Sequence, residues 1–252
     1  MRESDKYHTS EIQDELLGMM KDVHKFFEEK QIRYSLCGGS LLGAVRHEGF
    51  IPWDDDIDIM VDRENYNKIV ASFHECPGYV IKNDIWLYRI YRAGEAENYG
   101  AVIDIFVMDK TPKSKATQKI IMLCVRMLQG MLKEKIHYSK YSLKYRMCLF
   151  FTHVLGLPFS YVRKFKWYNA VSQLGKDDEA ESISMYDDTF DAIGICYEPN
   201  TMDRLALHKF EDTEFYITEL YDSYLTKRYG QYMIPVEERD RVPLHIGKER
   251  IG

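Results

Sequence analysis

Four aspartates lie within five consecutive positions, directly before an apolar run. They are Asp54, Asp55, Asp56 and Asp58, in the stretch CGGSLLGAVRHEGFIPWDDDIDIMV at residues 37–61. Carboxylates this close repel one another, so the cluster lowers stability unless a cation, a helix end or open water compensates. Asp54 and Asp55 are expected to be solvated loop charges or a helix cap, and a direct role in metal binding is the alternative.

Asp56 and Asp58 have the spacing that suits a shared cation. DIDIMV alternates acidic and apolar residues before it becomes fully apolar, which predicts a strand with one face buried. Residues two apart on a strand share a face, so both carboxylates point to the same side. Asp104, in VIDIFV, is a third carboxylate inside an apolar strand. It is costly there unless it meets the metal or a hydrogen-bond donor.

A Gly-Gly-Ser turn, Gly38, Gly39 and Ser40, stands between an expected strand (RYSLC) and a short helix (LLGAVR). It offers backbone N–H groups and a hydroxyl to a phosphate at a helix N-terminus. Arg46 ends that helix and is placed to reach a phosphate, although an ordinary surface position explains it equally well. Together with the three carboxylates, these parts predict a two-metal phosphoryl-transfer site, in which Asp56 and Asp58 would hold two Mg²⁺ or Mn²⁺ ions.

Side chains on the next expected strand could add to this site. Arg89 and Arg92 are three residues apart and face opposite sides of a strand, so at most one points into the site. Trp86, Tyr88 and Tyr91 could offer a face to a quaternary ammonium by cation-π contact, but strand and core packing is the commoner role.

The surrounding sequence predicts mixed helices and strands. Apolar spacing predicts a helix over 11–32 capped by Ser10, and Asp62 is expected to cap a second helix with Tyr66, Ile69, Val70 and Phe73 inward. Further strands are expected at 79–82, 86–92, 101–109 and within 204–217, with helices over 115–168, interrupted near Gly156, and over 218–229. Residues 172–191 are expected to be loop-like.

We therefore predict an α+β fold: a mixed β-sheet flanked by helices, with an inserted basic helical lobe. The expected divisions are a catalytic core over 1–109, the lobe over 110–170, and a C-terminal segment over 171–252 that completes the catalytic domain.

The lobe is strongly basic in an acidic chain. Residues 110–168 hold thirteen Lys or Arg and one acidic residue, Glu134, which gives +12 and leaves −18 for the remainder of a chain with net charge −6. No nucleic-acid module is recognisable, so nucleic acid is not an expected partner. Binding to an anionic membrane surface fits the basic and apolar composition, and a solvated helical face is equally compatible. The apolar run at 147–159 is too short and broken for a membrane span.

Five scattered cysteines and a polar N-terminus without an apolar signal region predict a cytoplasmic protein with reduced thiols. The basic lobe allows peripheral binding at the inner face of the membrane.

A Gly-Ser turn, a strand with Asp-x-Asp and a later strand with one Asp resemble the nucleotidyltransferase superfamily. GGSLLGAVRHEGFIPWDDDIDI resembles the signature of the LicD family, the bacterial phosphocholine transferases related to fukutin and fukutin-related protein. The closing segment FEDTEFYITELYDSYLTKRYGQYM resembles that family more loosely. Asp56 and Asp58 fall on the family's metal-binding pair, Asp104 on its third carboxylate, and Gly39 and Ser40 on its phosphate-contacting turn. Fifteen residues separate Ser40 from Asp56, more than in most nucleotidyltransferases but typical of this family.

The resemblance implies transfer of phosphocholine from CDP-choline, or a similar CDP-alcohol, to a sugar hydroxyl of a glycan such as teichoic acid or lipopolysaccharide, with release of CMP. The glycan acceptor could be built on a lipid carrier. Asp104 would also help to deprotonate the acceptor hydroxyl. Two alternatives stay open: a nucleotidyltransferase that releases pyrophosphate, and a catalytically silent glycan- or lipid-binding scaffold. His245 is a weaker site candidate, favoured only by a family-like position near the end of the chain.

Overall fold

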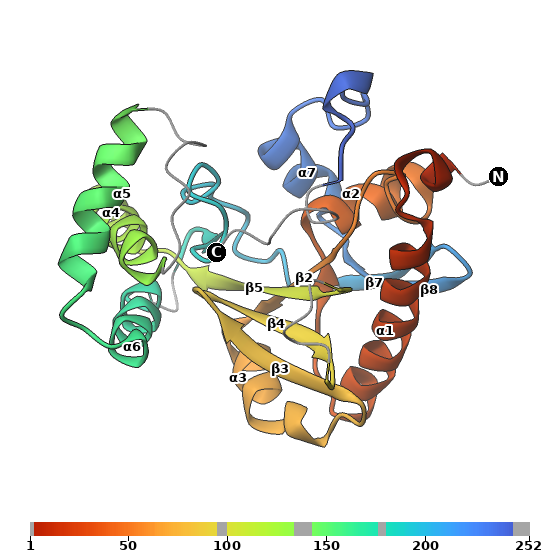
Figure 1. The fold of residues 1–252 in the computed structure, drawn as a ribbon, viewed down its shortest axis with the longest axis horizontal. Helices are drawn as coiled ribbons and strands as arrows, with labels where there is room; N and C mark the ends of the chain where they lie inside the picture. The colour runs from red at the N-terminus through yellow and green to blue at the C-terminus, as the bar shows by residue number, and fades with distance from the viewer. Residues whose placement is uncertain (1–2, 95–99, 134–142, 176–179, 244–252) are drawn as a thin grey trace. The chain divides into compact units, whose positions relative to one another are not determined.

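The computed structural model describes residues 3–94, 100–133, 143–175 and 180–243 (Figure 1). The chain forms two compact units. The first comprises the described residues of Met1–Lys82, Tyr88–Val107 and Asn200–Glu249, and the second those of Asn83–Leu87 and Met108–Pro199. The second unit therefore extends past the expected boundary at residue 170. The reason is strand β6, Ile183–Met185, which pairs with the end of β5 at Met108.

Strands and helices are both present, which confirms the predicted α+β class. The main sheet has the order β1-β2-β5-β4-β3, and β6 pairs with β5 off this path. The strands of this order are β1 (Ser35–Leu36), β2 (Ile57–Asp62), β3 (Tyr79–Asp84), β4 (Leu87–Arg92) and β5 (Ile103–Lys110). Because β2 and β5 are neighbours, two strands that are far apart in sequence bring their aspartates to one place.

The central strands form where apolar residues are most dense. Ile57, Ile59, Met60 and Val61 of β2 are fully buried, and Asp58 is the partly exposed exception in that run. Strand β4 pairs antiparallel with β5, and Arg89 lies opposite Asp104 in the register. The strands predicted around residues 57–61, 79–82, 86–92 and 101–109 are confirmed.

The first unit also contains four α-helices and a β-hairpin among its described residues. They are α1 (Ser10–Glu29), α2 (Gly38–His47), α3 (Arg63–Ser72), α7 (Tyr221–Tyr229) and the hairpin β7 (Leu205–Phe210) and β8 (Thr213–Thr218). In Figure 1, α1 runs beside the hairpin. The apolar side of α1 is buried, with Leu16, Met19 and Val23 inaccessible to solvent.

Several predictions about helix ends are confirmed and others are wrong. The Asp62 side chain accepts a hydrogen bond from the Asn65 N–H at the start of α3, and α7 ends at Gly230, as expected. Ser10 is not the cap of α1, because it is the first helical residue and Thr9 precedes it. Val70 is 41% exposed rather than inward.

The second unit packs three helices around an apolar core. They are α4 (Lys115–Leu132), α5 (Leu143–Gly156) and α6 (Tyr161–Ser172), which confirms the predicted helical segment and its break near Gly156. The core includes Ile121, Val125, Leu132 and Tyr168. The expected loop over 172–191 contains β6. Within the described part of the chain, no helix combines the length and apolar character needed to cross a membrane.

Candidate active site

The structure brings Asp56, Asp58 and Asp104 together. One carboxylate oxygen from each lies within 4.8 Å of the others. Asp58 projects from β2, Asp56 immediately precedes that strand, and Asp104 lies on the neighbouring β5. We call these residues the acidic triad. Strand alternation predicted that Asp56 and Asp58 share a face, and the family resemblance grouped Asp104 with them. Their roles in metal binding and catalysis stay predictions.

A second acidic group shares Asp56 with the triad. Asp54, Asp55 and Asp56 also place one carboxylate oxygen each within 4.8 Å of one another. Asp55 is fully buried, so the expectation of a solvated loop charge is wrong for this residue. The two groups together form a continuous patch of carboxylates from Asp54 to Asp104.

The electrostatics of the patch favour uptake of positive charge. Desolvation, followed by repulsion from Asp56 and Asp55, raises the pKa of Asp54 well above its ordinary value. Desolvation, followed by repulsion from Asp56, Asp104 and Asp54, likewise raises the pKa of Asp58, and Arg228 acts in the opposite direction. Oxygen ligands of this kind suit hard divalent cations, so the residues fit Mg²⁺ or Mn²⁺.

The Gly-Gly-Ser turn holds the carboxylates at close range. A side chain at Gly38 would collide with the Asp58 carboxylate, and Gly38 has a φ of +52°, which favours glycine. A Cβ at Gly39 would lie 2.6 Å from Asp54 Oδ2. Gly38 therefore requires glycine for its backbone conformation and for the close approach of Asp58, and Gly39 requires it for the close approach of Asp54.

The turn also forms hydrogen bonds to Asp58. The Gly39 N–H donates to Asp58 Oδ2 at 3.3 Å, and the Asp58 N–H donates to Ser40 Oγ at 2.9 Å. Ser40 is buried, and Gly-Gly-Ser forms the first turn of α2 rather than preceding it. The positive end of α2 thus faces a carboxylate. The predicted contacts of Gly38, Gly39 and Ser40 with phosphate stay predictions.

Arg89 holds the third carboxylate of the triad. Its Nε lies 2.8 Å from Asp104 Oδ1 and its Nη2 lies 3.2 Å from Oδ2, a two-pronged ion pair between the buried Asp104 and a partly exposed Arg89. Arg92 instead pairs with Glu15 at 3.1 Å, which confirms that only one of the two arginines turns toward the site. Because both oxygens of Asp104 accept from Arg89, its expected role as a base competes with this ion pair.

Helix α7 adds side chains that sequence reasoning missed. The Gly38 N–H donates to the hydroxyl of Tyr224 at 3.2 Å. The positive charge of Arg228 opposes the rise in the pKa of Asp58. The only signal in the sequence was the looser family likeness of the closing segment, which named no residue.

Comparison with known families bears directly on this geometry. Residues 31–115 match the sequence model described as LicD/FKTN/FKRP, nucleotidyltransferase domain. That range contains the Gly-Gly-Ser turn and all three members of the acidic triad. The chain carries a nucleotidyltransferase domain of the LicD family. The predicted resemblance to the LicD family is thereby confirmed for residues 31–115.

Individual relatives extend the likeness beyond that domain. The lipopolysaccharide cholinephosphotransferase LicD of Haemophilus influenzae is 27% identical over 91% of this chain and 93% of its own length. An uncharacterized protein of Rickettsia prowazekii is 27% identical over 81% of this chain and 65% of its own. Human ribitol 5-phosphate transferase FKRP is 53% identical over 38 residues, which are 15% of this chain and 8% of that protein.

The loop between the LicD signature's helix and strand is held from α1. Gln13 is buried, and its Nε2 donates to the backbone oxygens of Ile51 at 3.1 Å and Asp54 at 2.9 Å. Thr9 Oγ1 donates to Pro52 O at 2.6 Å. These contacts fix the backbone that carries Asp54, and nothing in the local sequence pattern distinguished Gln13 or Thr9.

Arg46, predicted to reach a phosphate, contacts other groups in the structure. Its Nε lies 3.0 Å from His47 Nε2, and its Nη1 donates to Tyr232 O at 3.0 Å. Burial, followed by the nearby Arg241, lowers the pKa of Arg46. The contact of Arg46 with phosphate stays a prediction.

The three aromatic residues proposed for a quaternary ammonium do not share one environment. Trp86 donates its Nε1–H to Asp187 O at 2.9 Å, Tyr88 packs edge-on against Tyr66, and Tyr91 is buried. Strand and core packing therefore describes them better than an aromatic face. His245 lies outside the described residues.

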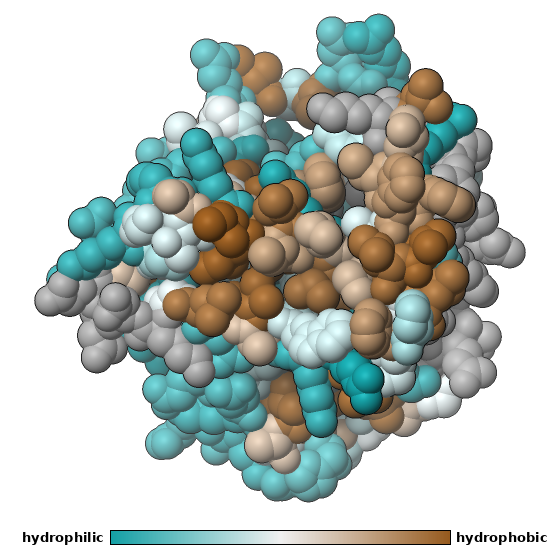
Figure 2. All heavy atoms as spheres, turned by 90° about the vertical axis from the view of Figure 1, so that its left-hand side faces the viewer, coloured by the Kyte–Doolittle hydropathy of each residue, from teal (hydrophilic) through white to brown (hydrophobic). Residues whose placement is uncertain are grey.

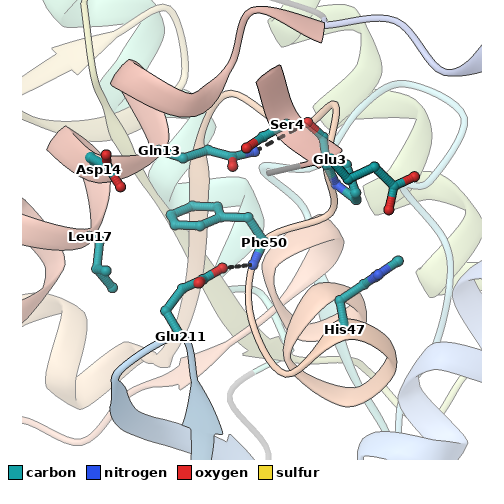
Figure 3. A pocket seen from close by; sticks show the side chains of 9 residues that line it. Glu3, Ser4, Gln13, Asp14, Leu17, His47, Phe50 and Glu211 are labelled. Carbon is teal, nitrogen blue, oxygen red and sulfur yellow. Dashed lines mark hydrogen bonds between the residues drawn. The ribbon is translucent and has the colours of Figure 1, made fainter. Parts of the chain in front are cut away.

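A separate pocket lies between the start of α1 and Phe50, with Glu211 at its edge (Figure 3). Its volume is about 220 Å³, and its lining includes the carboxylates Glu3, Asp14 and Glu211 together with Phe50 and His47. Glu211 accepts a hydrogen bond from the Phe50 N–H at 3.0 Å. None of the predicted site residues lines this pocket, so it is distinct from the acidic triad.

Proposed function

We propose that this chain transfers phosphocholine, or a related phospho-alcohol, from a CDP-alcohol to a sugar hydroxyl of a cell-surface glycan precursor. The observation that carries the proposal is the acidic triad within a LicD-family nucleotidyltransferase domain. The Haemophilus influenzae relative, matched along nearly its whole length, is named for cholinephosphate transfer to lipopolysaccharide.

In the proposed reaction, the acceptor hydroxyl oxygen forms a bond to the distal phosphorus of the CDP-alcohol. The bond from that phosphorus to the bridging oxygen breaks, and CMP leaves with the bridging oxygen. The hydroxyl proton passes to a carboxylate of the site or to water. Every atom is then assigned to either the phosphodiester product or CMP.

The residues of the site divide into two tasks. Asp56 and Asp58 would hold Mg²⁺ or Mn²⁺, which when bound neutralises phosphate charge and stabilises the leaving CMP. Asp104 completes the carboxylate set, and Arg89 keeps its two oxygens oriented. The Gly-Gly-Ser turn fixes Asp58 through two hydrogen bonds, so the triad is arranged before substrate binds.

Two enzymatic readings differ in the phosphorus that is attacked. A nucleotidyltransferase would attack the α-phosphorus of a nucleoside triphosphate and release pyrophosphate. Phosphocholine transfer attacks the distal phosphorus and releases CMP. The short match to a ribitol 5-phosphate transferase favours including a second alcohol among the candidate donors.

The test is incubation of the protein and Mg²⁺ with CDP-choline, CDP-ribitol, CDP-glycerol and the nucleoside triphosphates, with products identified by ³¹P NMR. We expect consumption of one CDP-alcohol and formation of CMP. Pyrophosphate from a triphosphate would support the nucleotidyltransferase, and no consumption with any donor or acceptor glycan would support a silent scaffold.

A further inference from the structure

Helix α5 carries its most apolar side chains on a face that is open to solvent. Leu143, Met147, Phe150, Phe151 and Val154 recur at intervals of three and four residues, which places them on one side of a helix. Their exposed fractions run from 43% for Val154 to 74% for Leu143. A helix of a globular protein normally buries such a stripe, whereas the apolar stripe of α5 faces solvent.

The packed side of α5 explains this orientation. Thr152 lies so close to Gly130 of α4 that a side chain at Gly130 would collide with it. A Cβ at Gly156 would lie 2.9 Å from Met131 O. Small residues thus let α4 and α5 approach closely along the Thr152 side, and this contact turns the Leu, Met and Phe stripe outward.

Neighbouring helices continue the apolar surface. Ile120, Leu123 and Met127 of α4 are 40–61% exposed, and in α6 Val162 is 61% and Trp167 38% exposed. Figure 2 faces the side of the molecule where α4, α5 and α6 lie, and it shows hydrophobic side chains gathered across that side. Contiguous exposed apolar surface of this kind marks an interaction site.

The charge of these three helices selects the partner. Their sequences contain eight Lys or Arg and no Asp or Glu. Lys119, Arg163 and Lys166 are exposed. A second copy of the same face would bring like charges together, which disfavours pairing between copies. An anionic surface with an apolar interior satisfies both the charge and the exposed stripe.

We propose that the face formed by α4, α5 and α6 docks onto an anionic lipid bilayer. The apolar stripe of α5 enters the boundary between headgroups and acyl chains, and the exposed basic residues Lys119, Arg163 and Lys166 contact lipid phosphates. Helix α5 has 14 residues, which is too short to cross a bilayer and suits a helix lying in its surface. The inference concerns the second unit and does not depend on the proposed transfer reaction.

The test is flotation of the full chain with vesicles of phosphatidylcholine alone or of phosphatidylcholine mixed with anionic phosphatidylglycerol. We expect flotation with anionic vesicles, weak flotation with neutral ones, and release as salt rises because exposed charges are screened.

Two matched pairs of variants separate the contributions. Phe150→Ser with Phe151→Ser should weaken partition by roughly tenfold or more, because two inserted side chains are lost. Leu207→Ser with Met233→Ser, exposed apolar residues of the first unit, should leave it unchanged. Arg163→Gln with Lys166→Gln should weaken binding at low salt, whereas Lys25→Gln with Lys82→Gln should not.

Circular dichroism and the melting temperature check that each variant folds, and light scattering of the free protein reports its oligomeric state. The proposal is supported if flotation weakens in the variant with Phe150→Ser and Phe151→Ser and is unchanged in the control variant with Leu207→Ser and Met233→Ser. Absence of flotation with anionic vesicles at low salt overturns it, as does a wild-type dimer that the Phe150 and Phe151 changes convert to monomer without affecting flotation.

Discussion

The acidic patch of the first unit and the α5 face of the second unit depart from the ordinary arrangement of side chains in different ways. Asp54, Asp56 and Asp58 are crowded carboxylates that repel one another, whereas Phe150 and Phe151 are apolar groups in water. Ordinarily a soluble protein keeps like charges apart and covers its large apolar stripes. Each departure is compensated in our account by something outside the chain, a divalent cation in one case and a lipid surface in the other.

The comparison also shows how differently the two regions are supported. The acidic patch is held by many directed contacts, from Gly39, Ser40, Arg89 and Gln13. The α5 stripe receives no such support and results from close packing on the other side of the helix. A site that does chemistry needs fixed positions, whereas a surface that enters lipid needs area and charge.

The largest effect is expected from Asp58→Asn. Removing a charge from the centre of the acidic triad should lower turnover of the CDP-alcohol by about 10²–10³-fold, the usual cost of losing one electrostatic group at a phosphoryl-transfer site. The fold should persist, because asparagine keeps the shape of the side chain. Steady-state kinetics with Mg²⁺ measure the effect, with Asp62→Asn as a control for loss of a carboxylate on the same strand. Near-normal turnover would remove Asp58 from the site.

Next in size is Arg89→Met, which leaves Asp104 without its ion-pair partner. Breaking a fully buried pair by removing one member destabilises a protein by about 3–5 kcal/mol, and this range is the upper bound here because the Arg89 side chain is 15% exposed. Urea unfolding of the metal-free protein measures the change. Added Mn²⁺ should recover part of the loss in this variant, because a cation can replace the guanidinium beside Asp104. Arg92→Met, whose partner Glu15 is more exposed, should cost less than about 1 kcal/mol.

The pH dependence of stability should report the crowding of carboxylates. Asp54 and Asp58 have raised pKa values in the folded chain, so the folded state holds protons that the unfolded state has released. Stability of the metal-free protein should therefore fall as pH rises from the ordinary aspartate range to the raised values. Each tenfold difference in proton affinity corresponds to about 1.4 kcal/mol.

Melting temperatures across pH, with and without Mg²⁺, measure this effect. Asp54→Asn should flatten the decline, and saturating Mg²⁺ should offset it, because a bound cation favours the ionised carboxylates. A melting temperature that rises with pH in the absence of metal would contradict the assignment of crowded, desolvated carboxylates.

The smallest effect is expected at the α5 face. Phe150→Ser with Phe151→Ser should change the free energy of unfolding by less than about 0.5 kcal/mol per residue, because neither ring is buried. Chemical denaturation in the absence of lipid measures this. A loss of several kcal/mol would mean that the two rings pack within the protein, and the contrast between the regions would disappear.

The site shows what a single sequence can predict. Asp56 and Asp58 could be assigned to one face from strand alternation, and Asp104 stood out as a lone carboxylate in an apolar strand. The family likeness supplied the adjacency of their strands. The role of Arg89 was predicted only in part. The spacing showed that at most one of the two arginines, Arg89 or Arg92, could turn toward the site, but it did not show which one.

The supporting contacts could not be predicted because they join distant segments. Gln13 reaches the loop at Asp54, and Tyr224 reaches Gly38, 186 residues away in the chain. No local pattern marks either side chain. The burial of Asp55 was missed because a run of three aspartates ordinarily indicates a solvated loop.

The orientation of α5 was also beyond the sequence. Periodicity identifies an apolar stripe, and the usual inference buries it. Which side packs is decided by the close approach of Gly130 and Thr152, a contact between two helices that composition does not reveal. The basic charge of the segment could be counted from the sequence, and it predicted an anionic partner. The exposed apolar face of α5 became known only from the structure.

The most direct test of the central claim follows the isotope of water in the absence of an acceptor glycan. In H₂¹⁸O with Mg²⁺, slow hydrolysis of CDP-choline substitutes water for the sugar hydroxyl, and mass spectrometry locates the label. Attack at the distal phosphorus predicts ¹⁸O in phosphocholine and none in CMP, with loss of both products in Asp58→Asn. Label in CMP would place the attack at the α-phosphorus and contradict the account.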